Sequence, residues 1–343
     1  MRTYHSEDHR LHFPQAELAG GQLVTPFERP SRVEYVLRRL RERGFEAPAD
    51  PGPCDLDAVA RVHAPDYLDF LERAWDDWVA DGNAGEIIAT NVPAPGMSAA
   101  RRPEGIEGQV GWYAHASETA MTAGTWAAAK ASAACAQAAT RDVMEGARHA
   151  FALCRPPGHH ATRAQFGGYC FLNNAAVAAR MLRDGGAGRV AVLDVDFHHG
   201  NGTQGIFWED GTVHLVSIHG DPLHAYPHYI GYADETGAGD GAGATTNLPL
   251  PPGTPYRDWA DALDRGIGAI RDRGAEALVV SLGTDAYRDD PISFFKLDSD
   301  DFRDMGARVA ALDLPAVVCF EGGYAIEAVG VNAVNFLEGL AGR

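Results

Sequence analysis

Two adjacent histidines, His159 and His160, lie in the segment RPPGHH, among proline and glycine residues. Histidine is the side chain whose ordinary pKa lies nearest neutrality, so two side by side can share proton-transfer work. They can equally be two loop residues without a chemical role. Other reactive groups brought to the same place would decide between these interpretations.

A second group of reactive residues lies in the segment DVDFHHGNG, which begins at Asp194. Residues two apart share a face of an extended strand, so we expect Asp194, Asp196 and His198 to point one way. A carboxylate and an imidazole at this spacing can bind one metal ion. A buried aspartate or histidine near a strand end can instead be a hydrogen-bonded structural residue, so this segment alone leaves both interpretations open.

Reactive residues also follow two apolar segments nearer the C-terminus. Asp285 comes shortly after LVVSLG, and Tyr324 ends the EGGY segment that follows AVVCF. Ligands of open α/β sheets bind beyond the carboxyl ends of the strands. Four of the expected strand ends therefore carry histidines, aspartates and a tyrosine hydroxyl, a set that is hard to ascribe to chance.

The residues Asp196, His198 and Asp285 would supply three protein ligands and leave one position open for water. Catalytic zinc sites have this arrangement, whereas structural zinc sites are closed by four protein ligands. Two carboxylates and one histidine form a harder ligand set than is usual for zinc, so Fe²⁺, Co²⁺ and Mn²⁺ are alternatives.

The elements that must position these groups follow one repeated pattern in the second half of the chain, in which short β-branched apolar segments alternate with stretches of helical spacing. Near-continuous apolar strands are typical of parallel sheets covered on both faces, so we predict an α/β fold with a largely parallel sheet. Ser299 is the expected N-cap of one helix. The expected strands are 149–154, 189–195, 213–218, 277–282 and 316–320, and the expected helices are 126–139, 173–184, 255–273, 299–312 and 325–340.

Two long stretches, 81–111 and 219–246, break this pattern and are expected to be irregular. Loops of this length in compact domains are usually functional or disordered. The GAGDGAG segment of the second stretch resembles a phosphate-binding loop superficially, but it follows no expected strand and opens no expected helix. We therefore interpret its glycines as part of a flexible loop.

Composition limits the classes of partner. The 343 residues are 45% hydrophobic, as in a globular protein with a large core, and their net charge is -18. That charge argues against a nucleic-acid partner and suits a cationic ligand, although solubility alone also explains it. Five scattered cysteines, no apolar segment of signal-peptide length at the start and no run of membrane-spanning length predict a soluble, cytoplasmic protein with no membrane partner.

The segments RPPGHH, GGYCFLNN, DVDFHHGNGTQ, SLGTDAY and EGGY resemble signature segments of the histone deacetylase superfamily. SEDH, FERPSRVEYV, IEGQVGWY, HGDP and DPISFFKL extend the resemblance, over nearly the whole chain, to its bacterial acetylpolyamine amidohydrolase branch. The resemblance implies a single deacetylase domain over residues 1–343, with an arginase-like three-layer α/β fold whose central, mostly parallel sheet is flanked by helices. It also implies zinc-dependent removal of acetyl groups from small N-acetylated polyamines or diamines.

The resemblance assigns two kinds of cation site. Asp196, His198 and Asp285 match the zinc ligands, and the metal would polarise the acetyl carbonyl and lower the pKa of its bound water. A structural potassium site is implied as well, with Phe207 in a further, outer site. The residues that match the inner potassium site are Asp194, Asp196, His198, Ser217 and Ile218.

The remaining catalytic roles are also implied by the resemblance. His159 and His160 match the general base and acid pair, with Asp194 behind His159. Tyr324 matches the hydroxyl donor that stabilises the tetrahedral oxyanion. Asn201 stands where one branch of the superfamily has an aspartate, and a neutral amide leaves His160 with a lower pKa than a carboxylate would.

Substrate contacts are expected from five further residues that match the family. Tyr169 and Tyr226 match the aromatic residues of a narrow tunnel, and the backbone carbonyl of Gly168 would accept the amide N–H. Tyr226 stands where phenylalanine is expected, so its hydroxyl could alter which amine is preferred. Glu107 and Glu118 match acidic positions near the tunnel mouth, where carboxylates attract a distal ammonium group. Ordinary packing for the tyrosines and a solvated helix face for Glu118 are the alternatives.

The long 81–111 loop is expected, by the same resemblance, to pack across a homodimer near the tunnel mouth and to exclude folded proteins. A deacetylase of acetyl-lysine in proteins or peptides is the main alternative, and it would need an open mouth. A manganese ureohydrolase of the arginase type would need a second metal with further ligands. A non-catalytic module that binds acetyl-amines or zinc fits poorly with retention of both histidines and Tyr324.

Overall fold

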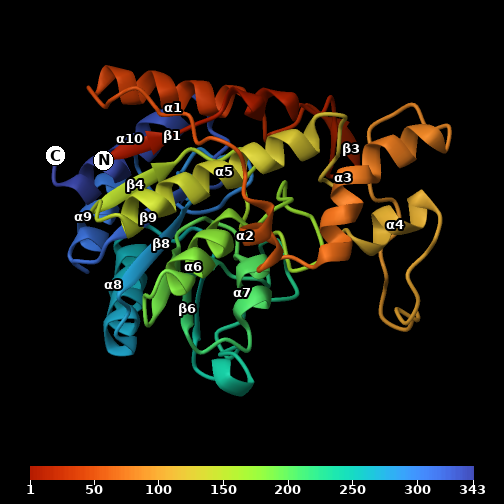
Figure 1. The fold of residues 1–343 in the computed structure, drawn as a ribbon. Coiled ribbons are helices and arrows are strands. Elements are labelled where there is room, and N and C mark those ends of the chain that lie inside the picture. The colour runs from red at the N-terminus through yellow and green to blue at the C-terminus, as the bar shows by residue number, and fades with distance from the viewer.

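A seven-stranded sheet runs through the centre of the computed structural model, which describes residues 1–343 (Figure 1). The strands lie in the order β1-β4-β9-β8-β5-β6-β7, and all neighbouring strands are parallel. A separate antiparallel hairpin pairs β2, Glu17–Ala19, with β3, Gln22–Val24. The strands of the central sheet are β1 Arg2–Tyr4, β4 His149–Ala152, β5 Val190–Asp194, β6 Val213–Gly220, β7 Thr245–Leu250, β8 Ala277–Leu282 and β9 Ala316–Phe320.

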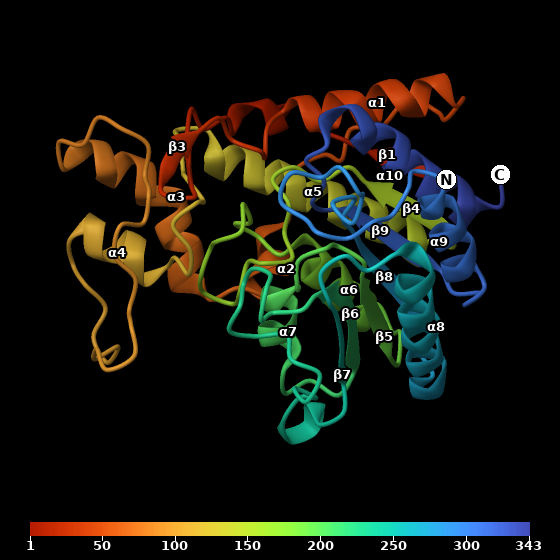
Figure 2. The same ribbon diagram turned by 180° about the vertical axis from the view of Figure 1, so that it is seen from behind.

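Helices cover both faces of this sheet, which confirms the predicted three-layer α/β architecture (Figures 1 and 2). Along β5, Val190 and Val192 belong to one buried apolar cluster and Ala191 and Leu193 to the other. Strands buried on both faces need apolar residues at every position, which explains their continuous apolar runs. The first cluster contains residues of α2 Leu56–Ala60, α3 Pro65–Ala80, α4 Ile106–Trp112, α5 Thr125–Met144, α6 Asn174–Asp184 and α7 Asn201–Phe207, and the second those of α1 Ser31–Glu42, α8 Tyr256–Arg273, α9 Asp301–Ala310 and α10 Ile326–Ala341.

The five predicted strands are confirmed to within a few residues at their ends, whereas both edge strands, β1 and β7, escaped prediction. β1 has three residues, too few for a visible periodicity. β7 reads TTNLPL, with polar residues and Pro249. Proline is confined to positions such as edge strands because it cannot donate to a ladder, so this composition lacks a clear strand signal.

The five predicted helices are also found, but the expected N-cap of α9 is wrong. The cap residue is Asp300, and its side chain makes no capping hydrogen bond. Asp301 accepts the backbone N–H of Asp298 instead, and the carbonyl of Ser299 accepts a hydrogen bond from Asn335. The contact with Asn335 ties the chain preceding α9 to α10, and the helix begins one residue later than expected, with Asp300 at the cap position.

Both stretches expected to be irregular contain some regular structure. α4 begins at Ile106, inside the first stretch, because Ile106 and Val110 share one buried face of the helix. The chain before α4 forms a loop that projects from the body of the molecule beside α3 (Figures 1 and 2). In the second stretch, β6 continues to Gly220, a short 3-10 turn spans Gly239–Gly241, and β7 begins at Thr245.

None of the helices combines the length and apolar character needed to cross a membrane. All five cysteines are free thiols.

Candidate active site

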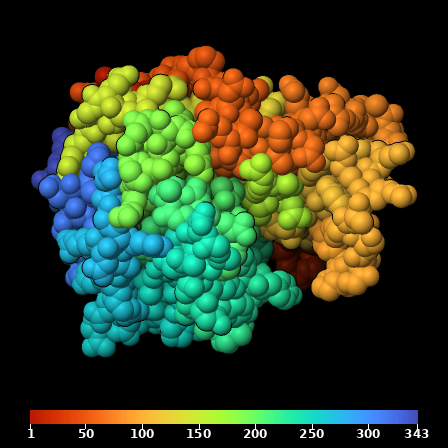
Figure 3. Space-filling model, turned by 60° about the horizontal axis from the view of Figure 1, so that its bottom comes forward, coloured from red at the N-terminus to blue at the C-terminus, as the bar shows by residue number.

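A cavity of about 460 Å³ opens where the carboxyl ends of the central strands meet the β2–β3 hairpin. In the space-filling view the surface is hollowed between the orange segment around residue 100 and the turquoise segment around residue 230, with the dark red N-terminal part at the base (Figure 3). The predicted site residues that line the cavity are Glu118, His160, Gly168, Tyr169, His198, Tyr226 and Tyr324.

The predicted metal ligands come together at the base of this site. Asp196, His198 and Asp285 are buried, and each offers one ligand atom within 4.8 Å of the other two. The Nδ1 atom of His198 lies 3.1 Å from Oδ2 of Asp285 and 3.3 Å from Oδ1 of Asp196. Asp285 follows β8, which pairs directly with β5, so two neighbouring strands deliver the three groups to one point.

The expectation that Asp194, Asp196 and His198 share one face of an extended strand is wrong. β5 ends at Asp194, and the backbone bends over residues 196–198. Oδ1 of Asp194 accepts the N–H of Asp196 at 3.1 Å, and Oδ1 of Asp196 accepts the N–H of His198 at 2.9 Å. Asparagine and aspartate side chains favour such turns because they bond to the backbone two residues on. The bend separates Asp194 from the ligand group and directs it to His159.

The three ligands fit one divalent cation. Asp196 also accepts the N–H of Gly322 at 2.8 Å, and a Cβ atom at position 322 would overlap the carboxylates of Asp196 and Asp285, so the loop approaches this closely only as glycine. Burial opposes the charge of His198, but the two carboxylates outweigh it and raise the pKa of His198 to about 10. A cation bound to both carboxylates would take the place of that proton on a neutral imidazole.

The two adjacent histidines have opposite electrostatic surroundings. Nδ1 of His159 lies 2.9 Å from Oδ2 of Asp194. Burial opposes the charge of His159, but Asp194 and Asp196 raise its pKa well above the ordinary value. Burial and the neighbouring imidazoles instead lower the pKa of His160, whose Nδ1 lies 2.6 Å from Oδ1 of Asn201. The pair therefore holds one charged and one neutral ring, 4.0 Å apart between centroids.

The loop that carries these histidines is fixed by Glu321, a buried residue that the sequence interpretation missed. Its Oε2 accepts the N–H groups of Gly158 and His159 at 2.6 and 3.2 Å. Burial raises the pKa of Glu321 to about 7. Its place beside Gly322 in the EGGY segment was the only signal in the sequence.

Tyr324 is held from both sides. Oδ2 of Asp290 accepts the N–H groups of Tyr324 and Ala325 at 2.7 and 3.1 Å. The guanidinium of Arg32 lies 4.9 Å from the centroid of the Tyr324 ring and donates to the carbonyl of Gly323. Burial raises the pKa of the Tyr324 hydroxyl, which therefore stays a hydrogen-bond donor at neutral pH.

Tyr169 and Tyr226 both line the cavity, beside His160 and Tyr324. The ring centroid of Tyr226 lies 5.0 Å from that of His160, and the ring centroid of Tyr169 lies 5.6 Å from that of Tyr324. Gly168 has a φ of 57°, and a Cβ there would overlap the ring of His160, so only glycine fits both conformation and space.

The two predicted glutamates differ in position. Oε1 of Glu118 accepts the N–H of Gly168 at 2.7 Å, so this carboxylate is part of the cavity wall and not a solvated helix face. Glu107 is exposed on α4 and does not line the cavity. The sequence interpretation missed Glu17, a second carboxylate at the cavity, whose Oε1 accepts a hydrogen bond from the hydroxyl of Tyr169 at 3.0 Å.

Of the residues proposed for potassium, Asp194, Ser217 and Ile218 lie on the adjoining strands β5 and β6. Asp194 of β5 pairs in register with Ser217 of β6, and both are buried, as are Ile218 and Phe207. The Ser217 hydroxyl lies 2.9 Å from Nδ1 of His219.

Comparison with known proteins gives one consistent result. The histone deacetylase domain matches residues 26–340. The chain is 52% identical to the acetylpolyamine amidohydrolase of Mycoplana ramosa over 342 residues and 48% identical to acetylpolyamine amidohydrolase 1 of Pseudomonas aeruginosa over 346 residues, with 99% or more of each chain covered. A crystal structure of acetylpolyamine aminohydrolase from Burkholderia pseudomallei superposes with a TM-score of 0.94 at 39% identity, covering 99% of this chain and 98% of that one.

Proposed function

Because this chain belongs to the histone deacetylase family, we propose that it is a metal-dependent hydrolase that removes acetyl groups from small N-acetylated polyamines and diamines. The observation that carries the proposal is the convergence of Asp196, His198 and Asp285 beside two histidines and Tyr324 at one cavity. Carboxylates at the cavity wall supply the preference for a cationic amine.

When it is occupied, the metal site would polarise the acetyl carbonyl and lower the pKa of a bound water. Zn²⁺ is the proposed ion, with Fe²⁺, Co²⁺ or Mn²⁺ as alternatives for a ligand set of two carboxylates and one imidazole. A structural potassium ion between β5 and β6 accompanies it in this proposal.

His160 is the group placed to move a proton. The carbonyl oxygen of Asn201 faces its Nδ1, so Nδ1 carries the hydrogen and Nε2 is free to accept a proton from water and return it to the departing amine. His159, held charged by Asp194, stabilises negative charge that develops nearby. The hydroxyl of Tyr324 donates to the oxyanion, and the carbonyl of Gly168 accepts the amide N–H of the substrate.

Relative values of kcat/KM on acetylputrescine, acetylcadaverine, acetylspermine and an acetyl-lysine peptide test the substrate class. We expect the free acetylated amines to exceed the peptide by at least about tenfold, because carboxylates meet their second ammonium group. A higher value for the peptide would favour the protein-deacetylase alternative and would leave the catalytic assignment in place.

Glu118→Gln is expected to raise KM about fivefold for acetylated diamines. The Gln oxygen can still accept the N–H of Gly168, so this variant removes charge without releasing the cavity wall, as Glu118→Ala would. Glu118 is half-buried, and an ion pair that solvent still reaches contributes about 1 kcal/mol, which corresponds to that factor.

A neutral N-alkyl acetamide is the control substrate for Glu118→Gln, and its KM should stay unchanged. Glu46→Gln is the matched control variant, because Glu46 is an exposed carboxylate that does not line the cavity. An equal rise in KM for the neutral substrate would show that the variant acts through the position of Gly168 and not through charge.

Titration of the Glu17 carboxyl group is expected to make substrate preference depend on pH. Burial raises the pKa of Glu17 to about 7, with Tyr169 and Phe27 as hydrogen-bond donors and Glu118 and Glu28 as nearby acidic groups. The carboxyl group is therefore neutral below pH 6 and charged above pH 8. We expect kcat/KM for an acetylated diamine, relative to a neutral acetamide, to rise severalfold between these values, and Glu17→Gln to abolish that rise.

The chain is proposed to act as a cytoplasmic homodimer in which the 81–111 loop narrows the tunnel mouth of the assembly. The projection of the loop and α4 from the body supports this arrangement (Figure 1). In the proposed dimer Glu107, which does not line the cavity of its own chain, would reach the tunnel mouth of the partner. Five free cysteines fit a reducing compartment.

A further inference from the structure

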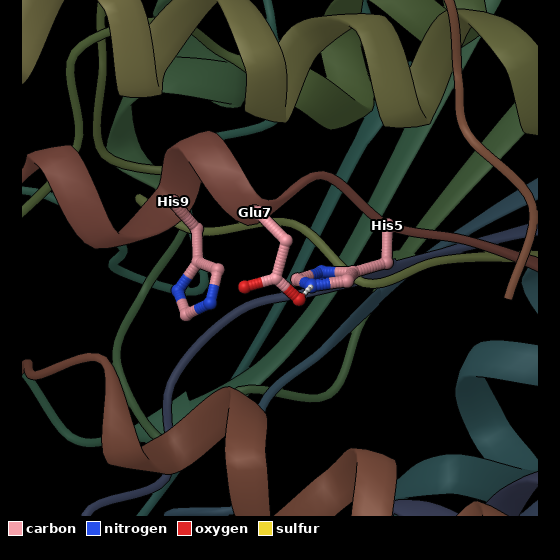
Figure 4. Close-up of side chains that lie close together, drawn as sticks. All are labelled: His5, Glu7 and His9. Atoms are coloured by element: carbon pink, nitrogen blue, oxygen red, sulfur yellow. Dashed lines mark ion pairs between the residues drawn. The ribbon is translucent and has the colours of Figure 1, made fainter.

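Two histidines and a glutamate cluster near the N-terminus, in elements that the active site does not use. His5 follows β1, and Glu7 and His9 belong to the 3-10 helix Glu7–Leu11. Figure 4 shows the carboxylate of Glu7 between the two imidazole rings. Each residue offers one ligand atom within 4.8 Å of the other two.

The imidazoles of this cluster lack the hydrogen bonds that buried polar groups normally make. His9 is 2% exposed, and neither of its ring nitrogens has a hydrogen-bond partner; the same holds for both ring nitrogens of His5. Unsatisfied buried groups in a native structure call for an explanation such as a bound ion or water. Burial lowers the pKa of both rings, that of His9 to about 3, so both are in the neutral form that binds metals.

The separations suit metal coordination. Nε2 of His5 lies 3.4 Å from Oε1 of Glu7, which matches the roughly 3.4 Å between two ligands on a tetrahedral ion with bonds of about 2.1 Å. The other Glu7 oxygen, Oε2, accepts a hydrogen bond from Nε of Arg10 at 2.8 Å, which leaves Oε1 for the cluster. Glu7 is 71% exposed at its side chain, so it can move toward His9 and water can reach the ion.

We propose that His5, Glu7 and His9 form a second metal site, which takes a first-row divalent cation such as Zn²⁺ with water as the remaining ligand. Two neutral imidazoles and one carboxylate are a donor set that zinc binds in proteins. The site has no general base or oxyanion donor beside it, so its role is structural. It would fix the 3-10 helix, in which the carbonyl of His9 accepts a hydrogen bond from Arg155 at the beginning of the RPPGHH segment.

The charges around the cluster set its expected affinity. The cation Arg10 pairs with Glu7, and Arg155 lies close enough to disfavour a proton on His9. Both cations oppose a divalent ion, so this site should bind zinc more weakly than the active site, which has two buried carboxylates.

The test is a zinc titration of the full-length protein after chelator treatment, read as bound zinc per chain by equilibrium dialysis and elemental analysis. We expect two equivalents for the native sequence and one for His5→Gln or Glu7→Gln. Glu34→Gln is the matched control, because Glu34 also pairs with Arg10, at 2.7 Å, but lies outside the cluster, so it should retain two.

Thermal unfolding supplies a second readout that separates loss of metal from loss of fold. Without zinc, Glu7→Gln and Glu34→Gln should unfold at similar temperatures, since both positions are exposed. With zinc, Tm should rise less for Glu7→Gln than for Glu34→Gln. A single equivalent in the native sequence, or two in both His5→Gln and Glu7→Gln, would overturn the proposal, whatever the deacetylase activity proves to be.

Discussion

Tyr324→Phe is expected to lower kcat by about 10²–10³-fold while the metal content of the protein stays unchanged. The substitution removes only the hydroxyl group, and deletion of one donor to a developing oxyanion costs about 3–4 kcal/mol in the transition state. The ring keeps its contact with the guanidinium of Arg32, and Asp290 still accepts the backbone N–H of residue 324. Little else in the loop should therefore move.

Measurement of kcat at saturating substrate, together with metal analysis of the same preparation, checks this expectation. Tyr169→Phe is the matched control: Tyr169 lines the same cavity, but its hydroxyl donates to Glu17. It should change KM and leave kcat within about threefold. A kcat of Tyr324→Phe close to that of the native protein would remove the oxyanion role from Tyr324.

Much of the site could be predicted because parallel strands deliver the residues that follow them to one edge of the sheet. His159 after β4, Asp196 after β5, Asp285 after β8 and Tyr324 after β9 each follow an apolar run visible in the sequence. The prediction needed only the strands and their common direction, and both were correct. The local backbone conformation was not needed for that prediction. Where the sequence interpretation did assume one, an extended strand through Asp194, Asp196 and His198, it was wrong, because the chain bends after Asp194.

The contacts that escaped prediction come from segments with no periodic signal. Glu17 reaches the cavity through a hairpin of two three-residue strands, and Asp290 lies in an irregular segment after β8. Glu321 was visible in a segment already singled out, but its hydrogen bonds to the histidine loop depend on how β4 and β9 pair. Such long-range pairings are set by the tertiary fold, so the spacing of residues along the sequence does not reveal them.

If Asp285 is a metal ligand and Asp194 is the partner of His159, the same aspartate-to-asparagine substitution should lower the metal content at position 285 but not at position 194. Asp285→Asn should bind one equivalent of metal less than the native protein, and kcat/KM should fall at least about 10³-fold, because metal polarisation of the carbonyl contributes several kcal/mol. The Asn oxygen can keep the hydrogen bond from the N–H of Phe197, which Oδ1 of Asp285 accepts at 2.8 Å. Its NH₂ group then faces His198, where metal binding needs a ligand oxygen. The variant should therefore fold but should not bind the metal.

Asp194→Asn is the matched control, since Asp194 is equally buried and lies at the same end of the sheet. It should retain the full metal content and still lose activity, by about 10²–10⁴-fold, because a neutral amide no longer holds His159 in its charged form. Metal analysis distinguishes the two variants even where both are nearly inactive. Loss of metal from Asp194→Asn with retention in Asp285→Asn would exchange the two roles, and the bend after β5 would then have to open to bring Asp194 onto the ion.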